Sequence, residues 1–142
     1  MKVVDTNILV YAHRRDSAFH GQAAACVRGL AEDQNAWAIP WPCVHEFLAV
    51  VTNPRIFKQP TPLPVALAQV ETWLDSPSLR LLAEEDGYWT VLARLLRSSH
   101  VQAAKVHDAR VAALAIFHGA RELLSADRDF SRFPELSCRN SL

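Results

Sequence analysis

The stretch KVVDTNILVY, residues 2–11, decides how the rest of the chain is interpreted. Its two valines are typical of a very short strand, and Thr6 and Asn7 are residue types that end strands and begin helices. The apolar residues that follow predict a short helix or turn over residues 8–13. Asp5 therefore falls at the carboxyl end of a strand, the edge of an open α/β sheet where ligands bind. Taken alone, an Asp in this position is more often a helix cap or a turn residue.

Strand and helix patterns alternate through the remaining sequence. Short apolar runs predict further strands at residues 36–40, 79–82, 122–124 and 136–138. Apolar residues at helical spacing predict helices at residues 17–33, 43–52, 64–74 and 105–118, and another that begins with the acidic residues 84–86 and ends near residue 97. This alternation predicts an α/β fold, a three-layer α/β/α sandwich around a parallel sheet.

The overall composition predicts a single domain that spans residues 1–142. Half of the residues are hydrophobic, which at this length is enough to build a core without disulfides. The formal net charge is zero, so bulk positive charge does not make the chain coat nucleic acid. Arginine makes up 12 of the 15 cationic residues. Arginine suits bidentate phosphate contacts, although a high-GC coding bias produces the same enrichment.

The cysteines and the apolar runs indicate the compartment. Cys26, Cys43 and Cys138 are far apart and have no spacing that would hold zinc, so we interpret them as buried thiols in a reducing compartment. The amino-terminal residues lack a signal-peptide pattern, and the longest apolar run, residues 111–117, is too short to cross a membrane. We therefore expect a soluble cytoplasmic protein with no membrane partner.

Residues 55–64 interrupt the regular pattern. Pro60, Pro62 and Pro64 exclude a helix interior, and we predict a flexible or partner-facing excursion here. The four tryptophans could stack nucleic-acid bases, but packing in the core is the simpler interpretation.

Acidic residues recur where a parallel sheet would gather them. Asp5 and the pair Asp127 and Asp129 follow predicted strands, while Glu46 and Asp108 lie near the starts of predicted helices. Strand carboxyl ends and the helix starts that follow them share one face of such a fold, so these side chains can converge. Converging carboxylates repel one another unless a cation lies between them. Carboxylate and water oxygens are the ligands that Mg²⁺ and Mn²⁺ prefer. One or two such ions can activate water against a phosphodiester.

Each of these residues has a structural interpretation when it is taken singly. Glu46 alone would be a solvated helix residue, Asp108 a charge that complements the helix dipole, and the later pair turn formers. Their joint placement on one predicted face favours the functional interpretation. His45 and His107 fit structural roles better than metal ligation. The arginines beside the acidic segments are candidate phosphate contacts: Arg14, Arg15, Arg110 and Arg128. The alternative is that they are solvated surface residues with no contact to a ligand.

With the acidic positions in hand, the sequence resembles the PIN-domain ribonucleases, and within them the VapC-type toxins of prokaryotic toxin–antitoxin pairs. Four segments carry the resemblance, in family order along nearly the whole chain: VDTNILVY (residues 4–11), CVHEF (43–47), VHDARVAA (106–113) and LSADRDF (124–130). Any one segment is weak evidence, whereas all four at this length are specific.

The resemblance implies a five-stranded parallel sheet between helices and Mg²⁺- or Mn²⁺-dependent endonuclease cleavage of RNA that leaves 5′-phosphate and 3′-hydroxyl ends. It also implies a homodimer and a small cognate antitoxin that inserts near the acidic site. By motif, the acidic quartet corresponds to Asp5, Glu46, Asp108 and Asp127. Asp129 matches an additional acidic position that part of the family uses, and Asn7 and Ser125 match polar positions that order the site.

The leading prediction is therefore a metal-dependent endoribonuclease whose metal ligands are Asp5 and Asp108, with Glu46 and Asp127 completing the shell directly or through water. One alternative is a non-catalytic RNA- or protein-binding module on the same fold. The second alternative is an aspartyl phosphotransferase. That enzyme class uses a D-x-D motif after its first strand, and this sequence has Asn7 in place of the second Asp, which argues against it. No P-loop, dinucleotide or G-x-S-x-G motif is present.

Overall fold

The computed structural model describes all 142 residues of the chain. The strands are β1 (Lys2–Val4), β2 (Trp37–Pro40), β3 (Leu79–Leu82), β4 (Glu122–Leu124) and β5 (Ser137–Arg139). The α-helices are α1 (Thr6–His13), α2 (His20–Glu32), α3 (Trp41–Val51), α4 (Leu63–Leu74), α5 (Tyr88–Ser99) and α6 (Val106–Phe117). Two short 3₁₀ helices are η1 (Ala103–Lys105) and η2 (Arg128–Arg132).

All five strands form one parallel sheet in the order β3-β2-β1-β4-β5, which confirms the predicted fold class and strand number. The chain starts in the middle of the sheet, adds β2 and β3 on one side, and then returns to place β4 on the other side of β1. The order of the strands therefore reverses between β1 and β4. In open α/β sheets such a switch point is where ligands bind.

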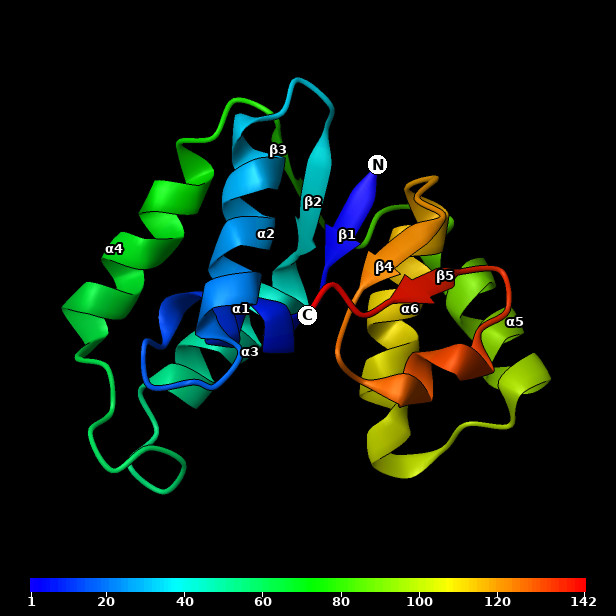
Figure 1. Cartoon of the computed structure of the whole chain (residues 1–142). Helices are drawn as coiled ribbons and strands as arrows, with labels where there is room; N and C mark the ends of the chain where they lie inside the picture. The colour runs from blue at the N-terminus through cyan, green and yellow to red at the C-terminus, as the bar shows by residue number, and fades with distance from the viewer.

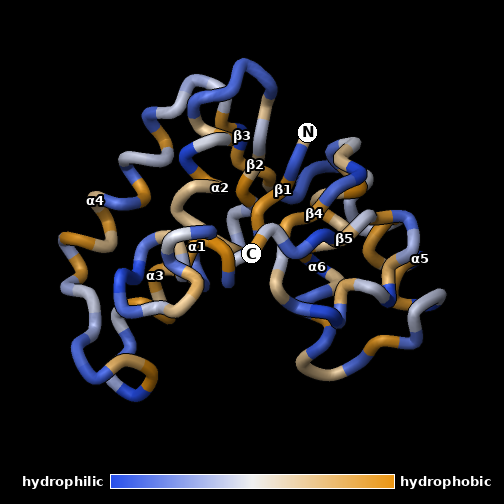
Figure 2. Tube along the Cα trace, in the orientation of Figure 1, coloured by the Kyte–Doolittle hydropathy of each residue, from blue (hydrophilic) through white to orange (hydrophobic).

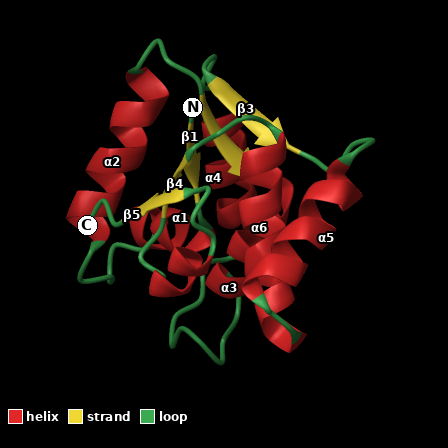
Figure 3. Ribbon diagram, turned by 90° about the vertical axis from the view of Figure 1, so that its right-hand side faces the viewer, coloured by secondary structure: helices red, strands yellow, loops and turns green.

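Helices cover both faces of the sheet, as the three-layer prediction requires. Helices α1, α2 and α4 lie on one side of the strands, and α5 and α6 lie on the other (Figure 1 and Figure 3). Helix α3 leaves the carboxyl end of β2 and contacts both α1 and α4. None of the helices combines the length and apolar character that a membrane span requires.

The core is apolar because the central strands are buried on both faces. Val3, Val4, Trp37 and Leu123 are fully buried, and the central strands carry orange segments in the hydropathy view (Figure 2). On α6, every residue from Ala109 to Ala115 except Arg110 is buried, because this helix packs across the sheet and is itself covered by α5.

Several sequence predictions need correction. Helix α5 begins at Tyr88, not at the acidic residues 84–86, because Gly87 adopts φ 93° and separates them from the helix. Helix α2 begins at His20 and not at Ser17, which instead accepts a hydrogen bond from the Phe19 amide in a turn. The other elements match the predicted ones to within a few residues at their ends.

The prediction that the tryptophans and cysteines are buried is wrong in part. Trp37 and Trp73 belong to the core, whereas Trp41 and Trp89 are exposed. Among the three free cysteines, Cys43 is buried and the other two are half-buried. The exposed tryptophans lie at or next to helix starts, where an apolar side chain at the edge of the buried stripe can face outward.

Candidate functional site

A pocket of about 500 Å³ lies at the carboxyl ends of the strands. Helix starts, the loop after α3 and the turn after β4 contribute its walls. The residues that line it are Asp5, Thr6, Asn7, Val10, Tyr11, Glu46, Val50, Ile56, Phe57, Ala104, His107, Asp108, Val111 and Asp127. The four members of the predicted acidic quartet all line this pocket, but only Asp108 and Asp127 belong, with Asp129, to one group of carboxylate oxygens within 4.8 Å of one another.

Asp5 is the buried centre of the pocket. It occupies the N-cap position of α1, yet its side chain makes no capping hydrogen bond, and only 7% of the residue is exposed. Its Oδ2 accepts hydrogen bonds from Ser125 Oγ at 2.7 Å and from Asn7 Nδ2 at 3.2 Å. The thiol of Cys43 lies 3.6 Å from its Oδ1. The cap interpretation of Asp5 is therefore wrong, and its carboxylate is committed to the pocket.

Asn7 joins the two turns that form the floor of the pocket. Its Oδ1 accepts a hydrogen bond from the Ala126 amide at 3.0 Å, and its Nδ2 donates to Ser125 Oγ at 3.0 Å. Ser125 Oγ in turn accepts from the Asp127 amide at 3.0 Å. The turn after β1 and the turn after β4 are thus tied together by side chains, and this fixes where Asp127 stands relative to Asp5.

Burial is the main electrostatic influence on Asp5. It raises the pKa of Asp5 from 3.8 to about 6, and the nearby charge of Glu46 adds to this effect while the hydrogen bond from Ser125 opposes it. Burial likewise raises the pKa of the Cys43 thiol, so this cysteine is a neutral neighbour of Asp5. An ionised, buried carboxylate of this kind is stabilised when a cation binds beside it.

Glu46 enters the pocket from α3. The helix starts directly after β2, with Pro42 in its first turn, and this brings Glu46 opposite the start of α1. Thr6 Oγ1 donates a hydrogen bond to Glu46 Oε2 at 3.2 Å. Glu46 itself is exposed, so its carboxylate stands at the mouth of the pocket and not in its floor.

Asp108, Asp127 and Asp129 form the second acidic group, and each offers a carboxylate oxygen within 4.8 Å of the others. The Asp129 amide donates to Asp127 Oδ1 at 2.9 Å, which caps η2 and holds the two residues together. Burial, followed by the charge of Asp127, raises the pKa of Asp108. A divalent cation would relieve this repulsion.

Lys105 is a site residue that the sequence reasoning missed. Its ammonium group forms an ion pair with Asp129 and lies 3.7 Å from Asp108 Oδ2. The ion pair lowers the pKa of Asp129 and raises the pKa of Lys105. The spacing of three residues between Lys105 and Asp108 was the available signal, because residues at that spacing are neighbours on a helical turn.

These donors fit a hard divalent cation. The pocket contributes carboxylate oxygens from the floor, the mouth and the α6 side, and it has no cysteine or histidine arrangement that would favour a softer metal. Burial is the main cause of the raised pKa values of Asp5 and Asp108, and neighbouring carboxylates add to it, so a cation beside them would favour their ionised forms.

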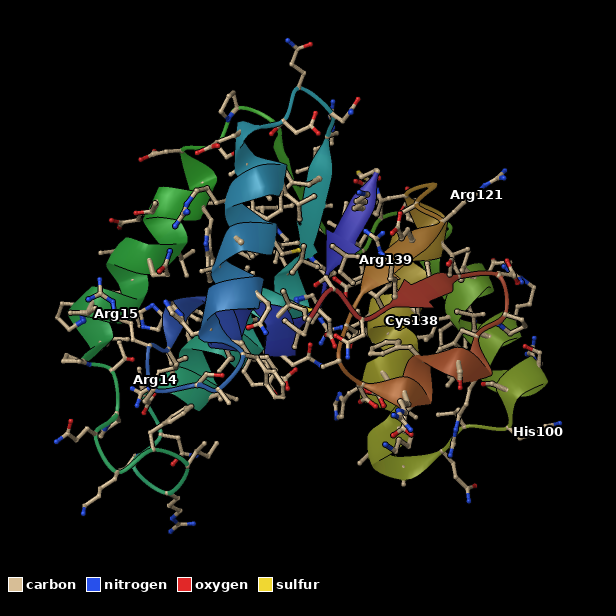
Figure 4. All side chains as sticks on the ribbon, viewed as in Figure 1. Arg14, Arg15, His100, Arg121, Cys138 and Arg139 are labelled. Atoms are coloured by element: carbon tan, nitrogen blue, oxygen red, sulfur yellow. The ribbon has the colours of Figure 1, made fainter.

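The four predicted arginines do not line the pocket. Arg14, at the end of α1, donates to the carbonyl oxygen of Gln59 at 2.8 Å, and its guanidinium lies 4.0 Å from the centre of the Phe57 ring (Figure 4). Arg110 forms an ion pair with Glu84. Arg15 and Arg128 are exposed at the surface. Arg14 therefore holds the loop after α3 in place.

Comparisons with known proteins concern the fold and the family of the chain. The family model of the PIN domain matches residues 2–136. Ribonuclease VapC43 of Mycobacterium tuberculosis is 34% identical over 142 residues, which are 100% of this chain and 96% of the relative. A solved structure of VapBC2 from Rickettsia felis, bound to a DNA fragment from its promoter, superposes with a TM-score of 0.71 at 20% identity, covering 98% of this chain and 97% of that one.

The solved structure of Mycobacterium tuberculosis VapC20, a sarcin–ricin loop cleaving toxin, superposes with a TM-score of 0.66 at 20% identity, and covers 92% of this chain and 93% of that one. These structures show the same fold, and the sequence relative shows the family. The resemblance first indicated by the four motif segments is thereby confirmed: the chain belongs to the PIN-domain family, within its VapC ribonucleases.

Proposed function

We propose that this protein is a metal-dependent endoribonuclease that hydrolyses RNA phosphodiester bonds as the toxin of a type II toxin–antitoxin pair. One observation carries the proposal. Asp5, Glu46, Asp108 and Asp127 line a single pocket at the switch point of the sheet, in a chain whose sequence relatives are VapC ribonucleases. Unrelated surface carboxylates would not all be expected in one pocket at that edge.

The proposed cofactor is Mg²⁺ or Mn²⁺, held by Asp5 and Asp108. Glu46 and Asp127 complete its shell directly or through water, with Asp129 as an additional acidic group. When bound, the ion would supply a nucleophile at neutral pH and stabilise charge on the leaving oxygen. Asp5, with its pKa of about 6, is mostly ionised at pH 7 and gives up its remaining protons when a cation binds.

The polar neighbours of Asp5 act through orientation. Both Ser125 and Asn7 donate to Oδ2, which fixes the rotation of the carboxylate and leaves Oδ1 with only the weak thiol donor of Cys43. A ligand oriented in this manner needs little reorganisation when metal and RNA bind.

The proposed partners follow from the same family. They are an RNA substrate with an exposed single-stranded segment, a small cognate antitoxin and a second copy of this chain. The VapBC2 structure from Rickettsia felis supports the antitoxin partner. We place the protein in the cytoplasm, where RNA targets and free thiols are found.

The rival functions are less well supported. A non-catalytic binding module on this fold would not need buried Asp5 held by a dedicated hydrogen-bond network. A phosphotransferase would need a second acid at position 7, but Asn7 stands there and uses its amide to join two turns.

Thermal unfolding of wild type and Asp108→Asn, with chelator and with Mn²⁺ or Mg²⁺, tests the proposal first. Metal that binds the folded state raises its stability by mass action, so the melting temperature of the wild type should rise and that of Asp108→Asn should rise much less. RNA cleavage on the same samples should be metal-dependent in wild type and lost in the variant.

Glu135→Gln is the matched control, because Glu135 is an exposed carboxylate that pairs with Arg94 away from the pocket. It should keep both the metal response and the cleavage. Cleavage by wild type in chelator, or undiminished cleavage by Asp108→Asn, would contradict the proposal.

A further inference from the structure

The pocket has a second wall that the acidic chemistry does not use. Val10 and Tyr11 of α1, Val50 of α3, and Ile56 and Phe57 of the following loop line the same pocket as the acidic quartet. Phosphodiester hydrolysis by a metal site requires carboxylates, but it does not require an apolar surface beside them. The apolar wall therefore calls for a separate explanation.

The loop of residues 52–62 is built to hold this wall in place. The amides of Ile56 and Phe57 both donate to the carbonyl oxygen of Asn53, at 3.1 and 3.0 Å, and the Thr61 amide donates to the Val51 carbonyl oxygen at 2.8 Å. The loop projects below α3 and α4 (Figure 1), and a short hydrophobic stretch stands out among its hydrophilic residues (Figure 2).

Contacts with α1 anchor the loop a second time. Besides its bond to the Gln59 carbonyl, Arg14 donates to Thr61 Oγ1 at 3.3 Å, and the ring of His13 lies 3.1 Å from the same oxygen. The arginine stacks on Phe57. These contacts tie the proline-rich segment to α1, and its role as a partner-facing segment stays a prediction.

Ile56 is the unusual member of the wall. It lines the pocket but remains 54% exposed. The hydrogen bonds of the loop hold it there, although the position does not bury its side chain. Exposed apolar surface of this kind next to a reactive site is typical of ligand recognition, because polar groups set orientation while apolar groups supply contact area.

The charges of the pocket indicate what the ligand is. No lysine or arginine is among the lining residues, and the Lys105 ammonium, 3.7 Å from Asp108 Oδ2, is engaged by Asp129. Inside the pocket, then, only a bound cation would attract an RNA phosphate. Additional affinity has to come from the other part of the nucleotide, the base, whose faces are apolar and pack on aromatic and aliphatic side chains.

We propose that the apolar wall is a subsite for an unpaired nucleobase adjacent to the scissile phosphate, and that Ile56 is a specificity-determining residue of the reaction. The proposal rests on the ribonuclease function argued above. The phosphate lies against the acidic residues, and the neighbouring base turns out of the strand and packs on Ile56 beside Phe57. A paired base could not reach this wall, so the subsite selects single-stranded RNA.

Cleavage kinetics with abasic RNA test the subsite. Single-stranded RNAs of random sequence first locate a site that wild type cuts with Mn²⁺. Copies of that RNA, each lacking one base near the cut, are then compared. For wild type, removal of one particular base should raise KM about tenfold and change kcat little, as expected for one lost stacking contact.

The variants are Ile56→Ala and Ile56→Asp, and the matched control is Leu74→Asp. Leu74 is a similarly exposed apolar residue on α4 that does not line the pocket. Both Ile56 variants should cleave intact RNA with a KM raised about tenfold and should no longer distinguish the abasic copy. Their melting temperature should rise with Mn²⁺ as it does in wild type, which separates base recognition from assembly of the metal site.

The outcomes separate this proposal from the one on which it rests. If wild type cleaves RNA and the Ile56 variants show wild-type KM and wild-type sensitivity to the missing base, the subsite is overturned while the nuclease stands. If the Ile56 variants cleave normally but escape inhibition by the antitoxin, the wall belongs to a protein partner and the subsite is likewise overturned. If wild type cleaves no RNA with Mn²⁺, both proposals fail together.

Discussion

The two sides of the acidic pocket are held by different forces. On the Asp5 side, buried polar side chains bond to one another and to the backbone across two turns, through Asn7 and Ser125. On the Asp108 side, carboxylates are only partly buried, and a surface lysine offsets part of their charge. We therefore expect the Asp5 carboxylate to keep its position whether or not a ligand is bound. We expect the carboxylates on the Asp108 side to exchange their contact with the lysine for a contact with the cation.

The largest effect is expected when the charge at the centre of the rigid side is removed. Asp5→Asn should lower RNA cleavage at least about 100-fold, because Asp5 is a proposed ligand of the cation, and a bound cation supplies several kcal/mol of transition-state stabilisation. Steady-state cleavage with Mn²⁺ measures this. Asp75→Asn, which changes an exposed carboxylate at the end of α4, should leave cleavage unchanged.

The same variant should make the metal-free protein more stable. Because the pKa of Asp5 is raised from 3.8 to about 6 in the folded state, protonated Asp5 favours folding, and this contribution is lost as pH rises through about 6. Above pH 7 the ionised form costs up to about 3 kcal/mol. Asparagine carries no charge, so in chelator at pH 8 the free energy of unfolding should exceed that of wild type by about 1–3 kcal/mol.

Urea unfolding in chelator between pH 4 and pH 8 checks the sign. Wild type should lose stability relative to Asp5→Asn as the pH rises, with most of the change between pH 4 and about pH 6 and little above pH 7. Parallel pH profiles for the two proteins would show that Asp5 does not carry the raised pKa. If Asp5→Asn is more stable but cleaves RNA more slowly, Asp5 is a functional residue whose charge destabilises the folded protein.

The sequence could locate the rigid side because its residues follow short strands directly. Two apolar pairs, Val3-Val4 and Leu123-Leu124, predict the last residues of two strands. Asp5 and Ser125 follow these pairs directly, so the sequence places both at the carboxyl edge of the sheet. The sequence could not show that the Asp5 side chain makes no capping hydrogen bond to α1. Its carboxylate instead accepts a hydrogen bond from Ser125, which lies 120 positions away.

The other side and the apolar wall were harder to predict for physical reasons. Lys105 reaches Asp129 from the end of η1, and the first residue of η1, Ala103, takes φ 56°. Ile56 lines the pocket because its loop is held by backbone hydrogen bonds to Asn53 and fastened to α1 by Arg14. Both placements are long-range consequences of the fold, and periodicity carries no information about them.

An intermediate effect is expected from the residue that joins the two turns. Asn7→Ala removes the donor to Asp5 and leaves the Ala126 amide without its partner. Cleavage should fall about 10–100-fold, as for other groups that orient metal ligands. Stability should fall by about 1–2 kcal/mol. Asn35→Ala, in the exposed turn before β2, is the control; an equal loss in both variants would show that Asn7 has no special role.

The smallest effect is expected on the adjustable side, where Lys105 competes with the cation. In the absence of metal its ammonium neutralises Asp129 and approaches Asp108, so an arriving cation must displace it. Lys105→Met keeps the length of the side chain and removes the charge. Metal affinity, measured by titration calorimetry, should therefore become about two- to fivefold tighter, in line with the modest strength of exposed ion pairs.

Arg94→Met is the matched control for Lys105→Met. It breaks an equally exposed ion pair, that of Arg94 with Glu135, and should leave metal affinity unchanged. High salt should shrink the difference between wild type and Lys105→Met, because exposed charges are screened. Weaker metal binding in Lys105→Met would mean that the lysine organises the carboxylates instead of competing for them, and the Asp108 side would then be preorganised in the same sense as the Asp5 side.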